Sequence, residues 1–168
     1  MEKIPSLNPI SSELKNLFDA DQADRMALHE DLDNQELMQK MVENDSHRLQ
    51  RAGEIYEQYK SGSLSLTNGE LVQLAFLFQH SRDTEDYWKA HELGESAGEE
   101  GKWIAAAAED RWLLSKGEKQ KWGTQFLYGT EQAPMLSDEE SGVTDEMRKE
   151  RKIPPRAEQM KVYQGDIE

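Results

Sequence analysis

Apolar residues recur every three to four positions along most of the chain, which is the spacing of one buried face on an α-helix. Residues 14–28 carry one such stripe and residues 37–56 carry a second, whereas residues 71–78 are apolar nearly all round. The third segment is therefore expected to be the most buried element. No window of four or more residues alternates between apolar and polar positions with the β-branched enrichment of a strand. The pattern predicts an all-α fold.

Helix start and stop signals divide this pattern into elements. Residues that cap helix N-termini stand before the apolar segments, and glycines stand where most of the segments end. The expected helices run from Ser11 or Ser12 to about Glu30, from Asn34 to Gly62, from Thr67 to about His80, from Asp83 to Gly98 or Gly101, and through Trp103 to Gly117. Thr67 and Glu70 have the spacing of a capping box, which strengthens that boundary.

After Pro134 the sequence no longer predicts long helices. A second capping box is followed by a short expected helix and then by two prolines; these features are Ser137 to Glu140, Thr144 to about Lys152, and Ile153-Pro154-Pro155. The last dozen residues are polar and are expected to be extended or mobile. We predict a single-domain bundle of five or six helices, with a helical domain over residues 1–133 and a C-terminal extended arm over residues 134–168.

The composition restricts the environment and the partners. The 168 residues contain no cysteine, no apolar run that could span a membrane and no apolar signal segment, so a soluble cytoplasmic protein is the simplest expectation. The net charge of −14 disfavours nucleic acid and anionic membranes, and leaves a basic protein or a small molecule as the expected partner. There is no Gly-rich phosphate loop and no zinc-binding or di-iron helix pattern, so neither a cofactor nor a metal is expected.

Charged and polar residues interrupt the apolar faces of four expected helices. They are Asp21 and Arg25 in the first, Asp45 in the second with Arg48 toward one edge, Gln79 and His80 at the end of the third, and Asp110 and Arg111 in the fourth. Because burying an unpaired charge is very unfavourable, these groups are expected to meet one another or a ligand.

A turn rich in hydrogen-bonding groups follows Gly117. It contains Gln120, Trp122, Thr124 and Gln125. Folding alone does not require this concentration of polar groups beside an apolar helix. We therefore predict that the turn and Asp110-Arg111 form one wall of an interior polar site, with Asp21, Arg25, Asp45 and His80 opposite and Trp122 as a candidate wall of a ligand pocket.

Several of these pieces together resemble an uncharacterised bacterial domain family with no assigned activity. The matching pieces are Asp21-Gln22-x-Asp24-Arg25, Asp45, Gln79-His80, Asp110-Arg111 and Gly117-x-x-Gln120-x-Trp122-Gly123-Thr124-Gln125, with a closing segment from Val143 to Pro155. In the family's last motif a tyrosine usually stands where this chain has Trp122. The resemblance covers roughly residues 12–157 and implies a mostly helical single domain, but it implies no substrate.

Two functional classes and one structural alternative remain open. The first is a metal-independent hydrolase or group-transfer enzyme acting on a small molecule, with His80 or Asp110 as acid or base. In that hypothesis the substrate is bound by Asp21, Arg25, Asp45, Gln79, Arg111, Gln120, Trp122, Thr124 and Gln125. The second is an acidic protein-binding module, immunity-like or regulatory, whose buried ion pairs are purely structural. A balanced ionic network that only fixes the fold is the third.

Overall fold

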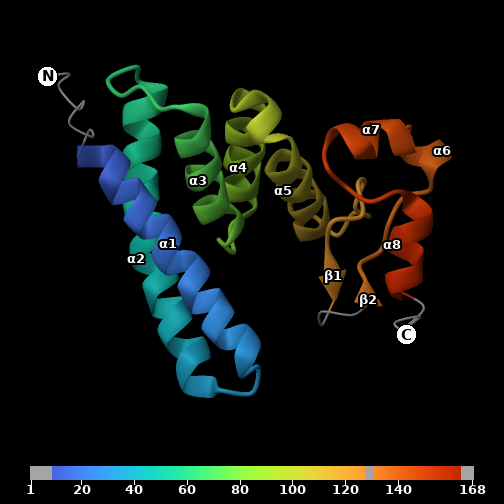
Figure 1. Cartoon of the computed structure of the whole chain (residues 1–168), viewed down its shortest axis with the longest axis horizontal. Helices are drawn as coiled ribbons and strands as arrows, with labels where there is room; N and C mark the ends of the chain where they lie inside the picture. Colours follow the sequence, from blue (N-terminus) through green and yellow to red (C-terminus); the bar gives the residue numbers. More distant parts are fainter. Residues whose placement is uncertain (1–8, 128–130, 164–168) are drawn as a thin grey trace, which may run out of the picture.

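The protein is a helical bundle with a smaller C-terminal segment beside it (Figure 1). The computed structural model describes residues 9–127 and 131–163. Five long helices come first, with a short 3₁₀ turn at Gly98–Glu100: α1 (Pro9–Glu30), α2 (Gln35–Lys60), α3 (Asn68–Gln79), α4 (Thr84–Ser96) and α5 (Lys102–Ser115). Shorter elements follow: β1 (Phe126–Leu127), β2 (Glu131–Gln132), α6 (Asp138–Ser141), α7 (Asp145–Glu150) and α8 (Arg156–Tyr163). The predicted all-α bundle is confirmed.

Side-chain caps fix most of the helix boundaries. The Asn34 side chain accepts a hydrogen bond from the Leu37 backbone N–H at 3.0 Å. Thr67 and Glu70 form the expected capping box at the start of α3, and Asp83 caps α4. These contacts satisfy backbone donors that have no partner within the helix. Helix α1 departs from its predicted start, because it begins at Pro9 rather than at a serine cap; proline is well tolerated in a first helical turn.

Three elements of the C-terminal segment were not expected from the sequence. Strands β1 and β2 form an antiparallel pair of two residues each, too short to show an alternating pattern. The predicted extended end is wrong for residues 156–163, which form α8. This helix is held by tertiary contacts, since the Arg156 N–H donates to Asp145 at 2.9 Å and the Gln159 amide donates to the Trp122 carbonyl at 3.0 Å. The predicted mobility of residues 164–168 lies outside the described residues.

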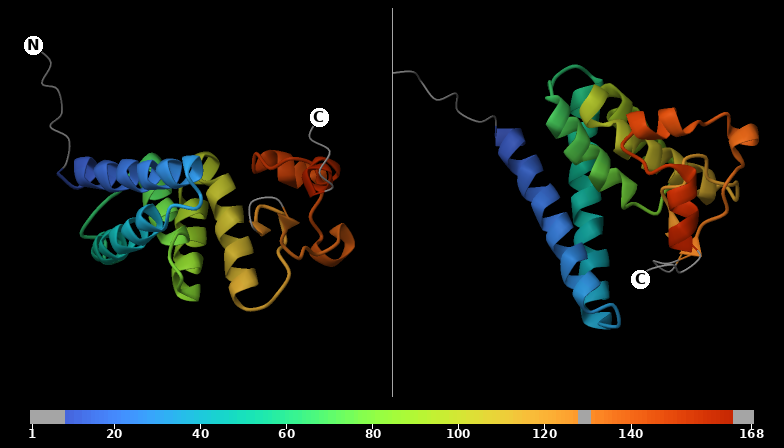
Figure 2. Two further views of the ribbon diagram at one scale, coloured as in Figure 1. Left: turned by 90° about the horizontal axis from the view of Figure 1, so that it is seen from below. Right: turned by 45° about the vertical axis from the view of Figure 1, so that its right-hand side comes forward.

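The main core surrounds α3, which contacts α1, α2, α4 and α5. Half of its residues are buried, in agreement with its apolar sequence, and the core is built chiefly from Leu14, Ile55, Leu74, Phe78, Leu93 and Ile104. The α1–α2 hairpin extends beyond the end of α3 (Figures 1 and 2). Within the described residues, no helix is both long and apolar enough to cross a membrane.

Helix α5 is shared between two apolar clusters. One side packs into the main core through Ile104 and Ala108. The other contributes Ala106 to a second cluster with Trp122, Val143 and Ile153, which joins the C-terminal segment to the bundle. The residues from Ile104 to Ala108 are all buried because the alanines allow close approach from several directions.

Gly94 brings α4 against α5, as the run of small residues in this part of the sequence indicates. A Cβ atom at Gly94 would lie 2.8 Å from the Ala105 backbone nitrogen, so only a shift of one helix would accommodate it. A Cβ atom at Gly53, in the middle of α2, would meet nothing within 4 Å in the described parts of the chain. These two helical glycines therefore differ in packing and not in backbone conformation.

We expect Gly94→Ala to destabilise the protein by roughly 1–3 kcal/mol through overpacking. Gly53→Ala is the matched control and should stabilise it by about 0.4–1 kcal/mol, because alanine loses less backbone entropy on folding. Urea denaturation of both variants measures the difference. Equal effects of the two substitutions would contradict close α4–α5 packing.

Candidate functional site

An ion-pair network joins α1 to α2 where both pass the end of α3. Arg25 pairs with Asp21 at 3.0 Å and with Asp45 at 3.0 Å. Arg48, which is buried, pairs with Asp24 at 2.8 Å and with Asp45 at 2.6 Å. The residues are one helical turn apart on each helix, so the network follows from the register of the α1–α2 pair.

His80 lies at the C-terminal end of α3 and completes this network. Its Nδ1 atom is 3.0 Å from Oδ1 of Asp21, a carboxylate that is 1% exposed. Because a carboxylate only accepts hydrogen bonds, this contact assigns the proton to Nδ1. The other ring nitrogen, Nε2, is then an acceptor, and the Gln79 amide nitrogen lies 3.5 Å from it. Asp21 thus orients the ring and leaves Nε2 with a lone pair.

The environment keeps this imidazole neutral near pH 7. Burial is the main reason that the pKa of His80 is lowered from 6.5, and Arg25 and Arg111 lower it further. The hydrogen bond and charge of Asp21 oppose this effect without reversing it. A neutral imidazole whose Nε2 carries a lone pair can accept a proton.

His80 opens onto a cavity of about 400 Å³, which we call the arginine cavity. Its polar lining comes from α1, α2, α5 and the turn after α3, and consists of Arg25, Asp45, Ser46, His80, Arg82 and Arg111. Its apolar lining comes from α2 and consists of Met41, Val42 and Leu49. Cationic groups therefore outnumber carboxylates around the cavity.

Arg111 is half-buried and, unlike Arg25, has no carboxylate partner among the described residues. The Tyr87 side chain hydrogen bonds to it, but the described parts of the chain supply no carboxylate to its guanidinium. Its Nε atom is buried, with no hydrogen-bond partner among the described residues. Burial lowers the pKa of Arg111, and the nearby charge of Arg25 lowers it as well, whereas Tyr87 raises it. An arginine remains charged in such surroundings, so the cavity wall holds a positive charge without a counter-ion from the described chain.

Asp110 lies on another side of α5 and does not line the arginine cavity. Its Oδ1 accepts the backbone N–H groups of Lys121 and Trp122 at 2.7 and 2.9 Å. Its Oδ2 accepts the backbone N–H and the hydroxyl of Thr124 at 2.9 and 2.7 Å. Burial raises the pKa of Asp110, and these hydrogen bonds act in the opposite direction. Through these hydrogen bonds the carboxylate attaches the turn after α5 to the helix.

Gln120 and Gln125 hold the same turn in shape. The buried Gln120 amide donates to the carbonyls of Gln125 and Ala133, both at 2.9 Å, and accepts the Gln125 backbone N–H at 2.9 Å. The Gln125 amide donates to the hydroxyl of Thr124 at 3.0 Å. Trp122 is buried in the second apolar cluster, and its indole donates to Glu109 at 2.6 Å.

The predicted single site is therefore divided by α5. The structure brings Asp21, Arg25, Asp45, Gln79, His80 and Arg111 together, but it places Asp110, Gln120, Trp122, Thr124 and Gln125 in the turn on the other side. Arg82 and the apolar lining from α2 were not singled out from the sequence. Arg82 stands in a turn with no periodicity, so no sequence signal marks it. Among the described residues, no group of three or more His, Asp or Glu side chains is placed to hold a metal ion.

Comparisons with protein-family models, with curated proteins and with solved structures gave no match. The family resemblance based on the sequence motifs therefore stays a prediction.

Asp110→Asn is expected to destabilise the protein by roughly 3 kcal/mol. The amide nitrogen of asparagine would face two N–H or O–H donors that the carboxylate now accepts, and these donors would be left buried and unsatisfied. Glu118→Gln, at an exposed position near the same turn, is the control and should change stability by less than about 0.5 kcal/mol. Urea denaturation provides the measurement. A fully stable Asp110→Asn variant would show that the hydrogen bonds of the carboxylate do not stabilise the fold.

The lowered pKa of His80 predicts a loss of stability in weak acid. Since the unfolded chain binds a proton at a higher pH than the folded chain, the contribution is present above pH 6.5 and is lost as the pH falls below it. His80→Gln should remove this contribution, so the wild-type protein should lose more stability than the variant between pH 7 and pH 5. Denaturant unfolding at each pH tests this. Parallel pH profiles would contradict a neutral, half-buried His80.

Proposed function

We propose that this chain is a small cytoplasmic protein that binds an organic anion in the arginine cavity and acts on it as a hydrolase or group-transfer enzyme. The proposal rests on Arg111. A half-buried guanidinium that lacks a carboxylate among the described residues is unfavourable in the free protein, and an anionic ligand would supply the missing counter-ion. Arg25 would share the ligand, although its charge is already balanced in part by Asp21 and Asp45.

The apolar lining supports an organic ligand over a simple inorganic ion. Met41, Val42 and Leu49 cover one part of the cavity, while the cations cover another. A phosphate or carboxylate group against Arg25 and Arg111 would leave its apolar portion beside these α2 side chains. The cavity volume of about 400 Å³ is in the range of small-molecule sites.

His80 is the proposed general base. Its Nε2 atom would take a proton from a water molecule or a substrate hydroxyl, and the resulting nucleophile would attack a carbonyl or phosphoryl centre as the leaving group departs. Arg25 and Arg111 would stabilise the negative charge that develops on the oxygen of that centre. Asp21 is a positioning residue in this scheme, because it holds Nδ1 and stabilises the imidazolium that forms.

Thermal unfolding with inorganic phosphate, acetate and panels of phosphate and carboxylate esters tests binding, and product formation from the esters tests turnover. A bound anion at a hundredfold excess over its Kd should raise Tm by roughly 5–10 °C. Arg111→Met should abolish this response while leaving the free protein equally stable or more stable, since it removes a half-buried charge that has no carboxylate partner among the described residues. Arg51→Met, which alters an ion pair at the surface of α2, should keep the response. His80→Gln should keep binding but lose turnover.

The same panel separates this proposal from its alternatives. An Arg111→Met variant that is strongly destabilised, together with no response of the wild-type protein to any anion, would assign Arg111 to the fold alone. The acidic protein-binding module is favoured by apolar side chains exposed on the α1–α2 hairpin, of which Met26 and Leu32 are 67% and 65% exposed. Capture of a stoichiometric basic protein with salt-sensitive affinity would support that alternative.

A further inference from the structure

The apolar side of the arginine cavity is a strip along a single helix. Met41, Val42 and Leu49 line the cavity, and all three belong to α2. Met38 lies one turn further along the helix, at the spacing that places residues i, i+3 and i+4 on one face. The apolar strip therefore continues from the cavity lining to Met38.

Exposure along this strip rises toward the end of the α1–α2 hairpin. Leu49 is half-buried and packs against the main core, whereas Val42 and Met38 are 39% and 46% exposed. Figures 1 and 2 show the end of the hairpin standing apart from α3, α4 and α5. The exposed part of the strip is thus an apolar surface that leads away from the cavity into solvent.

The cationic groups lie at the inner end of the strip. Arg25 pairs with Asp45 at 3.0 Å, which fixes the level of α2 beside which its guanidinium lies. His80 and Arg111 line the cavity together with Arg25. Asp45 and Met38 are two helical turns apart, or about 10 Å along the helix axis. The site therefore combines a positively charged end with an apolar strip of about that length.

Carboxylates predominate at the outer end of the hairpin. Residues 30–43 expose five carboxylates and one lysine, which are Glu30, Asp31, Asp33, Glu36 and Glu43, with Lys40. An anionic head group is repelled there and attracted by the arginines, so the charges fix the direction in which a ligand with one anionic end would lie. The same carboxylates disfavour the surface of an anionic bilayer.

The strip is narrow and its side chains are flexible. It is one helix face wide, and the described lining of the arginine cavity contains no Phe, Tyr or Trp. Methionine adapts its shape to an irregular apolar partner. A flexible aliphatic chain can follow such a strip along its whole length, whereas a rigid ring contacts only part of it.

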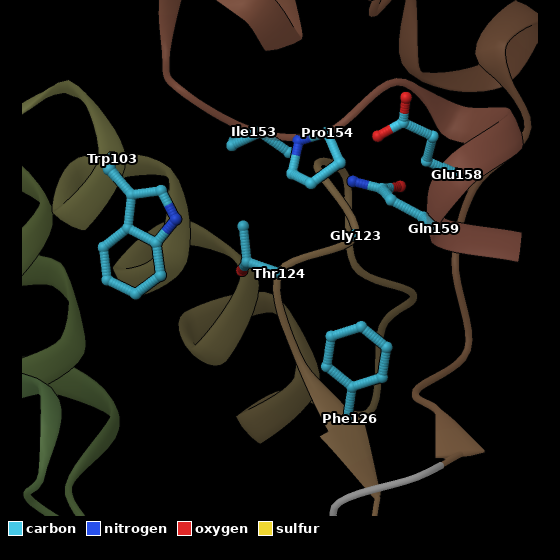
Figure 3. Close-up of a pocket in the computed structure, with 8 residues that line it drawn as sticks. All are labelled: Trp103, Gly123, Thr124, Phe126, Ile153, Pro154, Glu158 and Gln159. Atoms are coloured by element: carbon cyan, nitrogen blue, oxygen red, sulfur yellow. The ribbon is translucent and has the colours of Figure 1, made fainter. Parts of the chain in front are cut away.

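The cavity between α5 and the C-terminal segment has a different character. We call it the tryptophan cavity; its volume is about 260 Å³, and Trp103, Phe126 and Pro154 stand around it (Figure 3). The part of its lining that the structure describes contains no arginine, lysine or histidine. It therefore lacks the positively charged end that an anionic ligand needs.

We propose that the arginine cavity binds a free amphiphile with a single anionic head group and an unbranched aliphatic chain. Arg25 and Arg111 bind the head group, and the chain follows α2 past Met41 and Val42 to Met38. This inference rests on the proposed function, because it gives the organic anion of that proposal its chemical class.

Straight-chain carboxylates from acetate to octanoate test the chain on the whole protein, with the matching alkylphosphonates as a second head group. Calorimetric titration should show the Kd falling about twofold with each added methylene. Full burial of a methylene corresponds to about fourfold, and one side of the chain faces solvent here. Octanedioate has the length of octanoate but a second carboxylate. It should lose most of this gain, because its far end reaches the carboxylates of the hairpin.

Met38→Gln locates the far end of the chain. Glutamine has nearly the length and helix propensity of methionine, so the change chiefly removes apolar contact. It should weaken octanoate binding about threefold and leave butanoate binding unchanged, because only the longer chain spans the two turns to Met38. Met147→Gln, at a similarly exposed position of α7, is the matched control and should change neither affinity. Arg111→Met should weaken every member of the series.

The outcomes separate this inference from the proposed function. Binding that depends on Arg111 but has one Kd for all chain lengths would overturn the inference and leave the proposed function intact. A chain-length effect that Met38→Gln leaves unchanged, or octanoate binding that Arg111→Met does not weaken, would place the chain elsewhere and overturn it as well. Retention of the protein by phosphatidylglycerol vesicles without affinity for monomeric octanoate would identify a bilayer in place of a free amphiphile. No response to any anion would contradict both proposals.

Discussion

The carboxylate of Asp110 attaches the turn after α5 to the helical bundle. Four hydrogen bonds from Lys121, Trp122 and Thr124 end on its two oxygens, so a single buried side chain fixes the path of the turn after α5. Once that path is fixed, Trp122 is placed in the second apolar cluster and its carbonyl is presented to Gln159 of α8. Helix α8 and the tryptophan cavity both depend on this attachment, because each uses the turn as one of its sides.

The charged groups in the interior differ in whether the described chain supplies a partner for them. Asp110 is satisfied completely by donors within the protein, which is the arrangement that a structural carboxylate requires. The guanidinium of Arg48 is also paired, since the carboxylates of Asp24 and Asp45 both contact it. Arg111 is the exception, because the described chain gives it a tyrosine hydroxyl and no carboxylate. A network that served only to fix the fold would gain by pairing this charge or by replacing it with an apolar side chain.

Local signals in the sequence were sufficient to predict the helices. They were not sufficient to predict which polar residues lie on which side of α5. Asn34, Thr67 and Asp83 act within one turn of their own positions, so their capping roles follow from spacing alone. Helical phase also indicated that Asp21, Arg25 and His80 face inward. Adjacent residues of one helix can face different partners, and Asp110 faces away from Arg111. Its partners lie in the turn at residues 120–124, more than ten positions along the chain, so its spacing within the helix does not reveal them. Helix α8 was missed for the same reason, since Asp145 and Trp122 hold it from a distance.

Helix α5 connects the two cavities physically. Its alanines let two clusters pack against it, while Arg111 lines one cavity and Trp103 lines the other. A movement of α5 that improved the contact of Arg111 with an anion would also move the aromatic wall of the second cavity. The close contact at Gly94 resists such movement, because the backbones of α4 and α5 already touch there. We therefore expect an anion in the arginine cavity to leave the tryptophan cavity nearly unchanged. Any coupling between the two cavities would pass through the contacts of the C-terminal segment with α5, which include the turn held by Asp110 and the second apolar cluster.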